Sequence, residues 1–368
     1  MKYHRNLLSA LLPLLLAAVL SAPPVALACT GMRVKAKDGS VVFVRTMEFG
    51  GPTKSDIMVA PRGASWTALA PDGNKGLQWT SKYAFVGPNG LGLSSPLEGM
   101  NEKGLYAGGF WIPAGEAEFP KIAPADYSRM LAQPDVVTWL LSTCATLDDV
   151  RAGLKNVRIG GVFVKAMNLF PLAHWYVMDA TGKALVIECM EGKMTVTDNP
   201  VGVFTNAPSF GWHLQNLRNY ANLNPDNVTP HKLGDLDMHQ FGEGSGLVGL
   251  PGDSTPPSRF VRAAFLANLA LPPADADGAV NLGMNLIDNF TIPVGVNRAV
   301  EDGKTSYDYT QWNTVYDLAR KAVYFRTYTN HNYRMVRFNK LPLDGKKVHI
   351  VPMWGVKAAY EDVSGTAK

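Results

Sequence analysis

Hydrophobic and polar positions follow two different periods along the chain. Alternation at every second residue, typical of strands, marks the segments 29–48, 63–83, 174–206 and 321–338, and helical spacing marks 123–156, 258–271 and 282–290. Strands, helices, strands, helices and strands in this order predict an α+β protein whose sheets are covered by helices, rather than a parallel doubly wound sheet. No internal repeat or linker interrupts the pattern, so a single domain over 29–368 is expected.

The segment 29–48 gives the clearest hairpin signal. Its alternation is interrupted at Asp38-Gly39, a pair that is typical of a tight turn between two antiparallel strands. The pattern predicts that Cys29 begins an edge strand and that the returning strand ends at Arg45 to Glu48. Such a hairpin would bring Arg45 close to Cys29.

The first 28 residues have the three parts of a secretory signal. Lys2 and Arg5 precede a mostly apolar stretch over 7–20, and Ala26-Leu27-Ala28 places small residues at the two positions that a signal peptidase recognises. The apolar stretch is too short for a comfortable membrane span, and no later segment approaches the required length. The sequence therefore predicts removal of residues 1–28 and export to the periplasm or the exterior, with no membrane span.

The charge balance argues against nucleic acid as a partner, and the cysteine and histidine spacings give no metal or cofactor site. The chain has 35 Lys and Arg against 31 Asp and Glu, which leaves no basic stripe for nucleic acid. The cysteines at 29, 144 and 189 form neither a disulfide framework nor a zinc-ligand spacing. Cys144 and Cys189 could pair, but two buried thiols are favoured. No histidine pattern suggests a metal site, and no cofactor is expected.

A glycine-rich segment and two histidines are interpreted as structural features rather than as binding sites. Gly244 to Gly249 matches GxGxxG, but neither a strand before it nor a helix after it is predicted, because Pro251 and Gly252 follow at once. We therefore expect a glycine-shaped loop there and no nucleotide site. His174 and His213 each stand beside a tryptophan, where a packed structural histidine is expected.

Cys29 follows the predicted cleavage site directly, and the local pattern leaves three interpretations open. It is a lipid-modified anchor, a small residue that happens to begin the mature chain, or an N-terminal nucleophile. In the third case the α-amino group, with a pKa of about 7.7–8.0 in model peptides, can accept the thiol proton without a histidine. Arg45 would then lower the pKa of the thiol and Glu48 could hold the α-ammonium group, although a solvated pair is the commoner fate of Arg and Glu.

Segments along the whole of 29–368 resemble the choloylglycine hydrolases, the bile salt hydrolases and penicillin V acylases among the N-terminal nucleophile hydrolases. The matching segments are CTGMRVKAKDG at 29, VRTMEF at 44, EGMNEKGL at 98, TNAPSFGWHLQNL at 205 and GSGLVGLPGDSTPPSRFVRAAF at 244. The resemblance implies a four-layer αββα sandwich of two antiparallel sheets. It also implies hydrolysis of a linear, non-peptide amide through an acyl-enzyme.

The resemblance also implies roles for individual residues. Cys29 would be the nucleophile and, through its own amine, the base. Arg45 resembles the family's arginine beside the thiol, and Arg259 its second active-site arginine. Asn206 resembles the family's asparagine at the oxyanion or the substrate amide. Glu48 stands where aspartate is usual, which lengthens that side chain by one methylene.

The residues quoted so far do not determine which amide is the substrate. Bile salt hydrolases often have Asn where this chain has Trp111, whereas penicillin V acylases have an aromatic residue there, and an indole N–H could donate to an oxyanion or form a pocket wall. Met47, Phe49 and Trp111 suit an apolar acyl group, and conjugated bile salts, penicillin V and N-acyl homoserine lactones are all candidates. The segment 210–243 resembles the loop through which relatives assemble tetramers, so a homotetramer is expected. The alternative of another class is a non-catalytic envelope lipoprotein anchored through Cys29.

Overall fold

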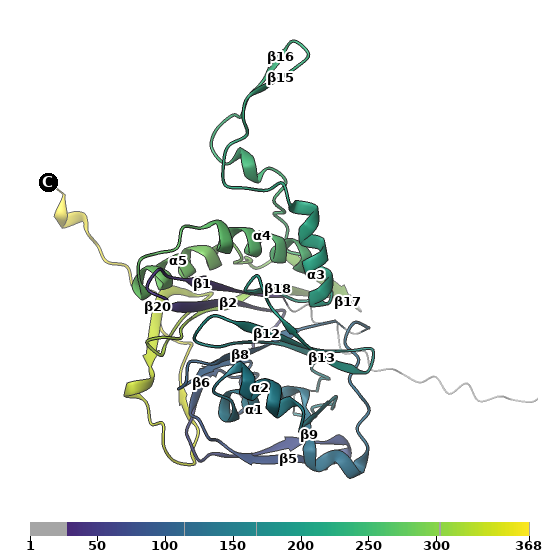
Figure 1. Ribbon diagram of the computed structural model, residues 1–368. Coiled ribbons are helices and arrows are strands. Elements are labelled where there is room, and N and C mark those ends of the chain that lie inside the picture. The colour runs from purple at the N-terminus through teal and green to yellow at the C-terminus, as the bar shows by residue number, and fades with distance from the viewer. Residues whose placement is uncertain (1–27, 114, 167, 302, 368) are drawn as a thin grey trace, which may run out of the picture.

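Sheets stacked face to face form the centre of the molecule. The computed structural model describes residues 28–113, 115–166, 168–301 and 303–367, so the predicted signal segment lies outside the described residues except for Ala28. Within these ranges, two large antiparallel sheets lie against each other and helices cover both outer faces (Figure 1). This arrangement is the expected four-layer αββα sandwich, and the α+β prediction is confirmed. No helix in the described part is long and apolar enough to cross a membrane.

The first sheet contains the predicted N-terminal hairpin. Its strand order is β14, β1, β2, β18, β19 and β20, with β17 paired to β18. The bounds are Val203–Phe204 for β14, Cys29–Lys35 for β1, Val41–Phe49 for β2, Asn297–Glu301 for β17, Lys304–Asp317 for β18, Ala322–Thr327 for β19 and Asn330–Arg337 for β20. The strand β2 is almost entirely buried, because neighbours cover both of its faces.

The second sheet lies beneath the first and ends with the C-terminal strand. Its order is β13, β12, β11, β8, β7, β6, β3 and β21. The bounds are Ile57–Ala60 for β3, Phe85–Pro88 for β6, Glu98–Asn101 for β7, Tyr106–Trp111 for β8, Ala173–Met178 for β11, Ala184–Met190 for β12, Lys193–Asp198 for β13 and His349–Val351 for β21. Smaller pairs join β4 (Ser65–Leu69) to β5 (Lys75–Thr80) and β9 (Met130–Ala132) to β10 (Arg158–Gly160).

Helices cover the outer faces where the sequence predicted them. The helices α4 (Pro256–Leu269) and α5 (Ala276–Asp288) pack on the first sheet, and α1 (Val136–Thr143) and α2 (Leu147–Leu154) lie on the second. The start of α2 is fixed by a capping box, because Thr146 Oγ1 accepts from the Asp149 N–H while the Asp149 carboxylate accepts from the Thr146 N–H. The predicted helices therefore supply both outer layers.

The N-terminal hairpin forms as predicted, but its position in the sheet differs from the prediction. Gly39 takes a left-handed φ of +89°, and Asp38 Oδ1 accepts from the Ser40 N–H at 2.8 Å, which closes the turn. The expectation that Cys29 begins an edge strand is wrong, because β14 pairs with β1 at Gly31 and Met32. The sequence pattern could not reveal this partner, since β14 lies far along the chain and pairs over two residues.

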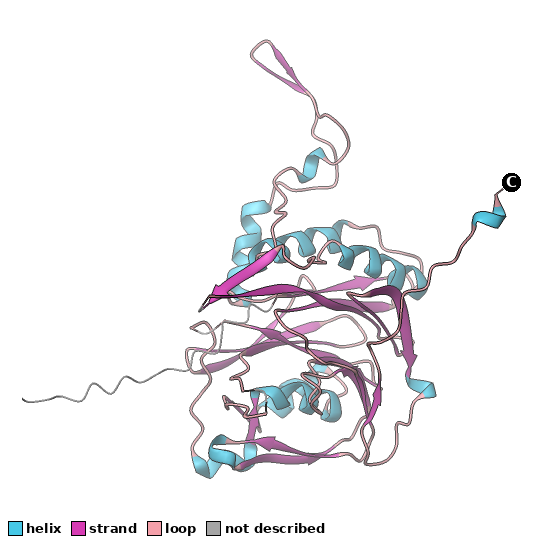
Figure 2. Cartoon of the chain, turned by 180° about the vertical axis from the view of Figure 1, so that it is seen from behind, coloured by secondary structure: helices cyan, strands magenta, loops and turns pink. Residues whose placement is uncertain are grey.

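Three other segments differ from their predicted structure. The strand segment predicted over 174–206 is divided between the sheets, since β11 to β13 stay in the second sheet while β14 lies in the first. The long strand β18 was not predicted, although it is the central neighbour of β2. The loop-rich region 207–258 contains the helix α3 (Phe210–Asn216) and a hairpin of β15 (His231–Leu233) and β16 (Leu236–Met238). This hairpin projects far from the sandwich (Figures 1 and 2).

The two cysteines outside the hairpin are buried thiols. Cys144 and Cys189 are each 2% exposed and unpaired, and both lie in the core between the second sheet and its helices. The favoured prediction of two buried thiols is therefore confirmed.

Candidate active site

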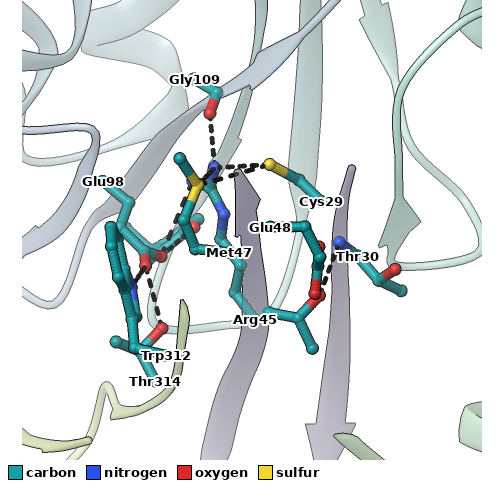
Figure 3. A network of polar contacts seen from close by, with 11 residues as sticks. Cys29, Thr30, Arg45, Met47, Glu48, Glu98, Gly109, Trp312 and Thr314 are labelled. Carbon is teal, nitrogen blue, oxygen red and sulfur yellow. Dashed lines mark hydrogen bonds and ion pairs between the residues drawn. The ribbon is translucent and has the colours of Figure 1, made fainter. Parts of the chain in front are cut away.

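The first hairpin places three functional side chains on one face of the first sheet. Cys29 lies opposite Met47 in the register of β1 and β2, and Gly31 lies opposite Arg45. Residues two apart point to the same face of a strand, so Cys29, Arg45 and Met47 all face the second sheet (Figure 3). The residue opposite Arg45 must be a glycine, because a Cβ at Gly31 would lie 2.5 Å from the ring of Phe43.

Arg45 contacts the thiol directly. Its Nη2 donates to Cys29 Sγ at 3.2 Å and to the Gly109 carbonyl at 2.7 Å, and its guanidinium lies 4.1 Å from the centre of the Phe110 ring. Burial raises the pKa of the Cys29 thiol, whereas the charge of Arg45 and its hydrogen bond lower it. The arginine therefore offsets part of the cost of forming a thiolate in a buried site.

Glu98 supplies a counter-charge to Arg45 that the sequence reasoning did not identify. Its Oε2 lies 3.8 Å from Arg45 Nη1 and accepts from the Tyr106 hydroxyl at 2.8 Å. Its Oε1 accepts from Trp312 Nε1 at 3.3 Å and from the Thr314 hydroxyl at 3.0 Å (Figure 3). Glu98 begins the segment EGMNEKGL. The sequence signal for this residue is therefore its place in a segment that resembles the family, which does not by itself indicate a contact with Arg45.

Asn206 and Arg259 meet at the main chain of Cys29. Asn206 Oδ1 accepts from the Cys29 N–H at 2.8 Å and from Arg259 Nη2 at 2.7 Å, while its Nδ2 donates to the Trp111 carbonyl at 2.8 Å. Arg259 Nη1 donates to the Cys29 carbonyl at 2.6 Å and to the Thr30 hydroxyl at 2.7 Å. Side chains 177 and 230 positions away in the sequence thus fix the orientation of Cys29.

Glu48 lies behind the cysteine and does not contact it through its carboxylate. Oε1 accepts from the Thr310 hydroxyl at 2.7 Å and Oε2 from the Thr46 hydroxyl at 3.0 Å. Burial raises the pKa of Glu48 to about 7, against the lowering effects of Arg259 and of these two hydrogen bonds. The main-chain N–H of Glu48 donates to the Ala28 carbonyl at 2.9 Å. In the chain with Ala28 still attached, the nitrogen of Cys29 is therefore held by Asn206 and not by Glu48.

An apolar cavity opens from the thiol. It has a volume of about 110 Å³, and Cys29 and Arg45 line it together with the three predicted substrate-binding residues, Met47, Phe49 and Trp111. Within the described residues, no cluster of three or more His, Cys, Asp or Glu side chains could hold a metal ion. The groups assembled around the thiol are thus those of acyl transfer, namely a buried sulfur, a cation and amide groups beside an apolar cavity.

Comparison with known proteins agrees with this geometry. The sequence profile of the linear amide C–N hydrolases, choloylglycine hydrolase family, matches residues 29–351. A bile salt hydrolase/transferase of Clostridium perfringens is 33% identical over 87% of this chain and 95% of that protein. A penicillin V acylase of Pectobacterium atrosepticum is 26% identical over 86% of this chain and 80% of that protein.

Solved structures share the fold over most of the chain. The crystal structure of a mutant of the conjugated bile acid hydrolase from Clostridium perfringens has a TM-score of 0.79 at 29% identity, covering 91% of this chain and 100% of that one. Penicillin V acylase from Agrobacterium tumefaciens has a TM-score of 0.71 at 26% identity, covering 90% and 94%. The chain therefore belongs to the choloylglycine hydrolase family of linear amide C–N hydrolases.

Proposed function

We propose that cleavage between Ala28 and Cys29 creates an N-terminal cysteine nucleophile that hydrolyses a linear amide. The observation that carries this proposal is that Cys29 presents its sulfur to Arg45 and its nitrogen to Asn206 at one end of an apolar cavity. The family match, which begins at residue 29, supports it as well. The residues proposed to act with this nucleophile in catalysis are Arg45, Glu48, Asn206 and Arg259.

The reaction takes two acyl-transfer steps. The free α-amine accepts the thiol proton, and the sulfur attacks the substrate carbonyl carbon, whose π electrons move to the oxygen. When the carbonyl re-forms, the C–N bond breaks and the α-ammonium group protonates the leaving amine. Water then attacks the thioester while the α-amine takes its proton, and cleavage of the C–S bond releases the acid and restores the thiol.

Asn206 is suited to orient the amine and to stabilise the oxyanion. Its Oδ1 already accepts from the nitrogen that becomes the α-amine. Its Nδ2 uses one N–H on the Trp111 carbonyl, so the second N–H of the amide is available to a developing negative charge. A single side chain would thereby align the base and stabilise the intermediate.

The cavity favours a slim acyl group. Its volume of about 110 Å³ is well below the roughly 300–1,000 Å³ of pockets that bury drug-sized ligands. Among the family's conjugated bile salt and penicillin V type substrates, we therefore propose the phenoxyacetyl group of penicillin V before a steroid. The same volume favours N-acyl homoserine lactones with a narrow acyl chain as the second candidate. No cofactor is proposed.

Mass spectrometry of the intact protein tests the nucleophile. The exported protein should begin with an unmodified Cys29, and rapid quenching with penicillin V should add one phenoxyacetyl group to it. Cys29→Ala should show no adduct, and Cys29→Ser should lose hydrolysis by about 10³-fold or more. An N-terminal lipid would support the envelope lipoprotein alternative instead, and undiminished hydrolysis by Cys29→Ser would remove the assigned nucleophile. A panel of penicillin V, glyco- and tauro-conjugated bile acids and acyl homoserine lactones ranks the substrates.

We also propose that the mature protein is an exported, single-domain homotetramer of residues 29–368 in the periplasm or outside the cell. The projecting hairpin β15–β16 supports the assembly, because Leu233 and Leu236 are 68% and 61% exposed and Phe241 beside them is fully exposed. Apolar side chains gathered on a projecting arm are typical of a surface that another chain covers.

A further inference from the structure

Two buried imidazoles hold consecutive carbonyl groups beside the active site. His174 Nε2 lies 3.1 Å from the carbonyl oxygen of Thr205, and His213 Nε2 lies 2.9 Å from that of Asn206. His174 comes from β11 in the second sheet and His213 from α3, whereas Thr205 and Asn206 follow β14 of the first sheet. The side chains are 1% and 0% exposed. The two histidines therefore fix the main chain of Asn206 from both sides.

The contacts of His174 require protons on both of its ring nitrogens. Its Nδ1 lies 3.1 Å from Glu188 Oε1, and its Nε2 faces a carbonyl oxygen, which is only an acceptor. A neutral imidazole has one N–H and could satisfy only one of these two acceptors. The Glu188 carboxylate also accepts from the Phe210 N–H, at 3.0 Å and 3.2 Å to its two oxygens, so both of its oxygens already act as acceptors. The second proton therefore belongs on the Nδ1 of His174.

Within the described part of the chain, His213, unlike His174, has a hydrogen-bond acceptor at only one of its ring nitrogens. Only its Nε2 has a hydrogen-bond partner among the described residues, and its Nδ1 is buried without one. The ring stacks on Phe260 with 4.5 Å between centroids. Burial, together with the nearby charges of His174 and Arg259, lowers the pKa of His213 to about 4. His213 is thus a neutral donor at physiological pH.

We propose that His174, held as an imidazolium by Glu188, and the neutral His213 are positioning residues that orient Asn206 for amide hydrolysis. The proposal rests on the proposed function of Asn206, because the two imidazoles touch only the main chain of this segment. Loss of the extra proton from His174 would leave either Glu188 or the Thr205 carbonyl without a donor. Either loss would loosen the segment that carries Asn206.

The charged groups around this pair come from other elements of the fold. Glu188 on β12 lies 3.1 Å from His174 Nδ1, whereas the charge of Arg259 on α4 acts on the neutral His213 of α3. Glu188 is 5% exposed, so its negative charge is the main local compensation for that of His174. Replacing this carboxylate by an amide keeps an acceptor oxygen but removes the negative charge.

Nitrogen NMR of the histidine rings tests the ionisation state directly. Protein labelled with ¹⁵N is compared with His174→Gln, whose spectrum identifies the resonances of His174. We expect two protonated ring nitrogens for His174 at pH 7 and a single protonated Nε2 for His213. An unprotonated Nδ1 of His174 at pH 7 would overturn the proposal. The spectrum does not depend on turnover, so its failure is distinct from a failure of the proposed nucleophile, which the Cys29 adduct reports.

The kinetic constants of the full-length processed enzyme test the positioning role. In Glu188→Gln kcat at pH 7 should fall by on the order of 10-fold, while KM changes little. The exposed Glu116→Gln is the matched control and should keep the wild-type constants. His213→Ala should lower kcat by on the order of 10–100-fold, and His213→Gln, which can still donate to Asn206, should recover part of it. An unchanged kcat in Glu188→Gln would overturn the positioning role even if His174 is an imidazolium.

Discussion

The guanidinium of Arg45 donates through Nη2 to the sulfur of Cys29 across 3.2 Å, and both residues are 1% exposed. Burial and the charge of Glu48 raise the pKa of this thiol, and Arg45 lowers it through its charge and its hydrogen bond. A thiolate is the reactive form of cysteine, so in the proposed reaction this pair would set the pH at which the sulfur attacks a carbonyl. On the other side of the guanidinium, Glu98 Oε2 lies 3.8 Å from Arg45 Nη1 and supplies the counter-charge.

Replacement of Arg45 should shift the reactivity of the thiol to higher pH. Arg45→Gln removes the cation, so the pKa of Cys29 should rise and kcat/KM at neutral pH should fall by about 10²-fold or more. The rate of alkylation by iodoacetamide, measured against pH, reports the thiolate. Arg129→Gln, at an exposed arginine remote from the thiol, should leave the curve unchanged. An alkylation curve unchanged by Arg45→Gln would contradict the assignment.

Two adjacent glycines in β8 should respond differently to the same substitution. A Cβ at Gly108 would lie 2.5 Å from the Tyr106 hydroxyl and 2.7 Å from Arg45 Nη1, whereas a Cβ at Gly109 would meet nothing closer than 3.6 Å. Gly108→Ala should therefore displace Arg45, cost about 1–3 kcal/mol in the free energy of unfolding and reduce kcat. Gly109→Ala should be tolerated. Urea unfolding and hydrolysis assays of both variants measure these effects. Equal effects of Gly108→Ala and Gly109→Ala would contradict the expected difference.

Trp111 lines the cavity, and its two suggested roles can be separated. Trp111→Phe keeps an apolar wall but removes the indole N–H. If the ring is a wall, as its place in the cavity lining indicates, kcat should stay within about threefold and the change should appear in KM. A fall in kcat of about 10²-fold with little change in KM would instead identify an oxyanion donor. Trp111→Ala, measured in parallel, should widen the range of accepted acyl groups.

Asp308 should make the protein less stable as the pH rises. Burial and the charge of Glu48 raise its pKa to about 8, and its Oδ1 lacks a hydrogen-bond partner among the described residues. Between the unfolded pKa near 4 and the folded pKa, the folded chain binds more protons than the unfolded chain, so the free energy of unfolding falls with rising pH. The slope is at most about 1.4 kcal/mol per pH unit.

Asp308→Asn should remove this dependence. The variant should match the wild type near pH 4 and become progressively more stable than it towards pH 8, as measured by urea unfolding at several pH values. The exposed Asp235→Asn is the control and should follow the wild type throughout. A stability difference that does not vary with pH would show that Asp308 is ionised in the folded protein.

The projecting hairpin should be required for assembly. Changing Leu233, Leu236 and Phe241 together to serine removes its exposed apolar surface and should convert a tetramer to smaller species in size-exclusion chromatography with light scattering. Leu271→Ser, at a leucine that is 88% exposed between α4 and α5, is the control. A wild-type protein that elutes as a monomer would refute the homotetramer.

Patterns within short segments predicted much of the fold. The turn at Asp38-Gly39 and the alternation around it defined β1 and β2, and the helical spacing over 123–156 predicted the region that contains α1 and α2. These features are local, since turn chemistry and helical spacing depend on residues a few positions apart. The strand β18 was not predicted, and nothing in the alternation over 174–206 indicated that β14 pairs in a different sheet from β11 to β13. Strand pairing depends on partners that are distant in sequence, which no local period reveals.

The sequence by itself determined the family, the α+β class and the side chains that gather at the site. It placed Cys29, Arg45, Asn206 and Arg259 among the functional residues, because motif spacing carries that information. Only the tertiary structure decided what each of them contacts. Glu98 became the partner of Arg45, and His174 and His213 became contacts of the Asn206 segment, because stacking the two sheets buries these polar groups together. Buried polar groups must find partners, and those partners are set by the packing of the sheets rather than by nearness in the chain.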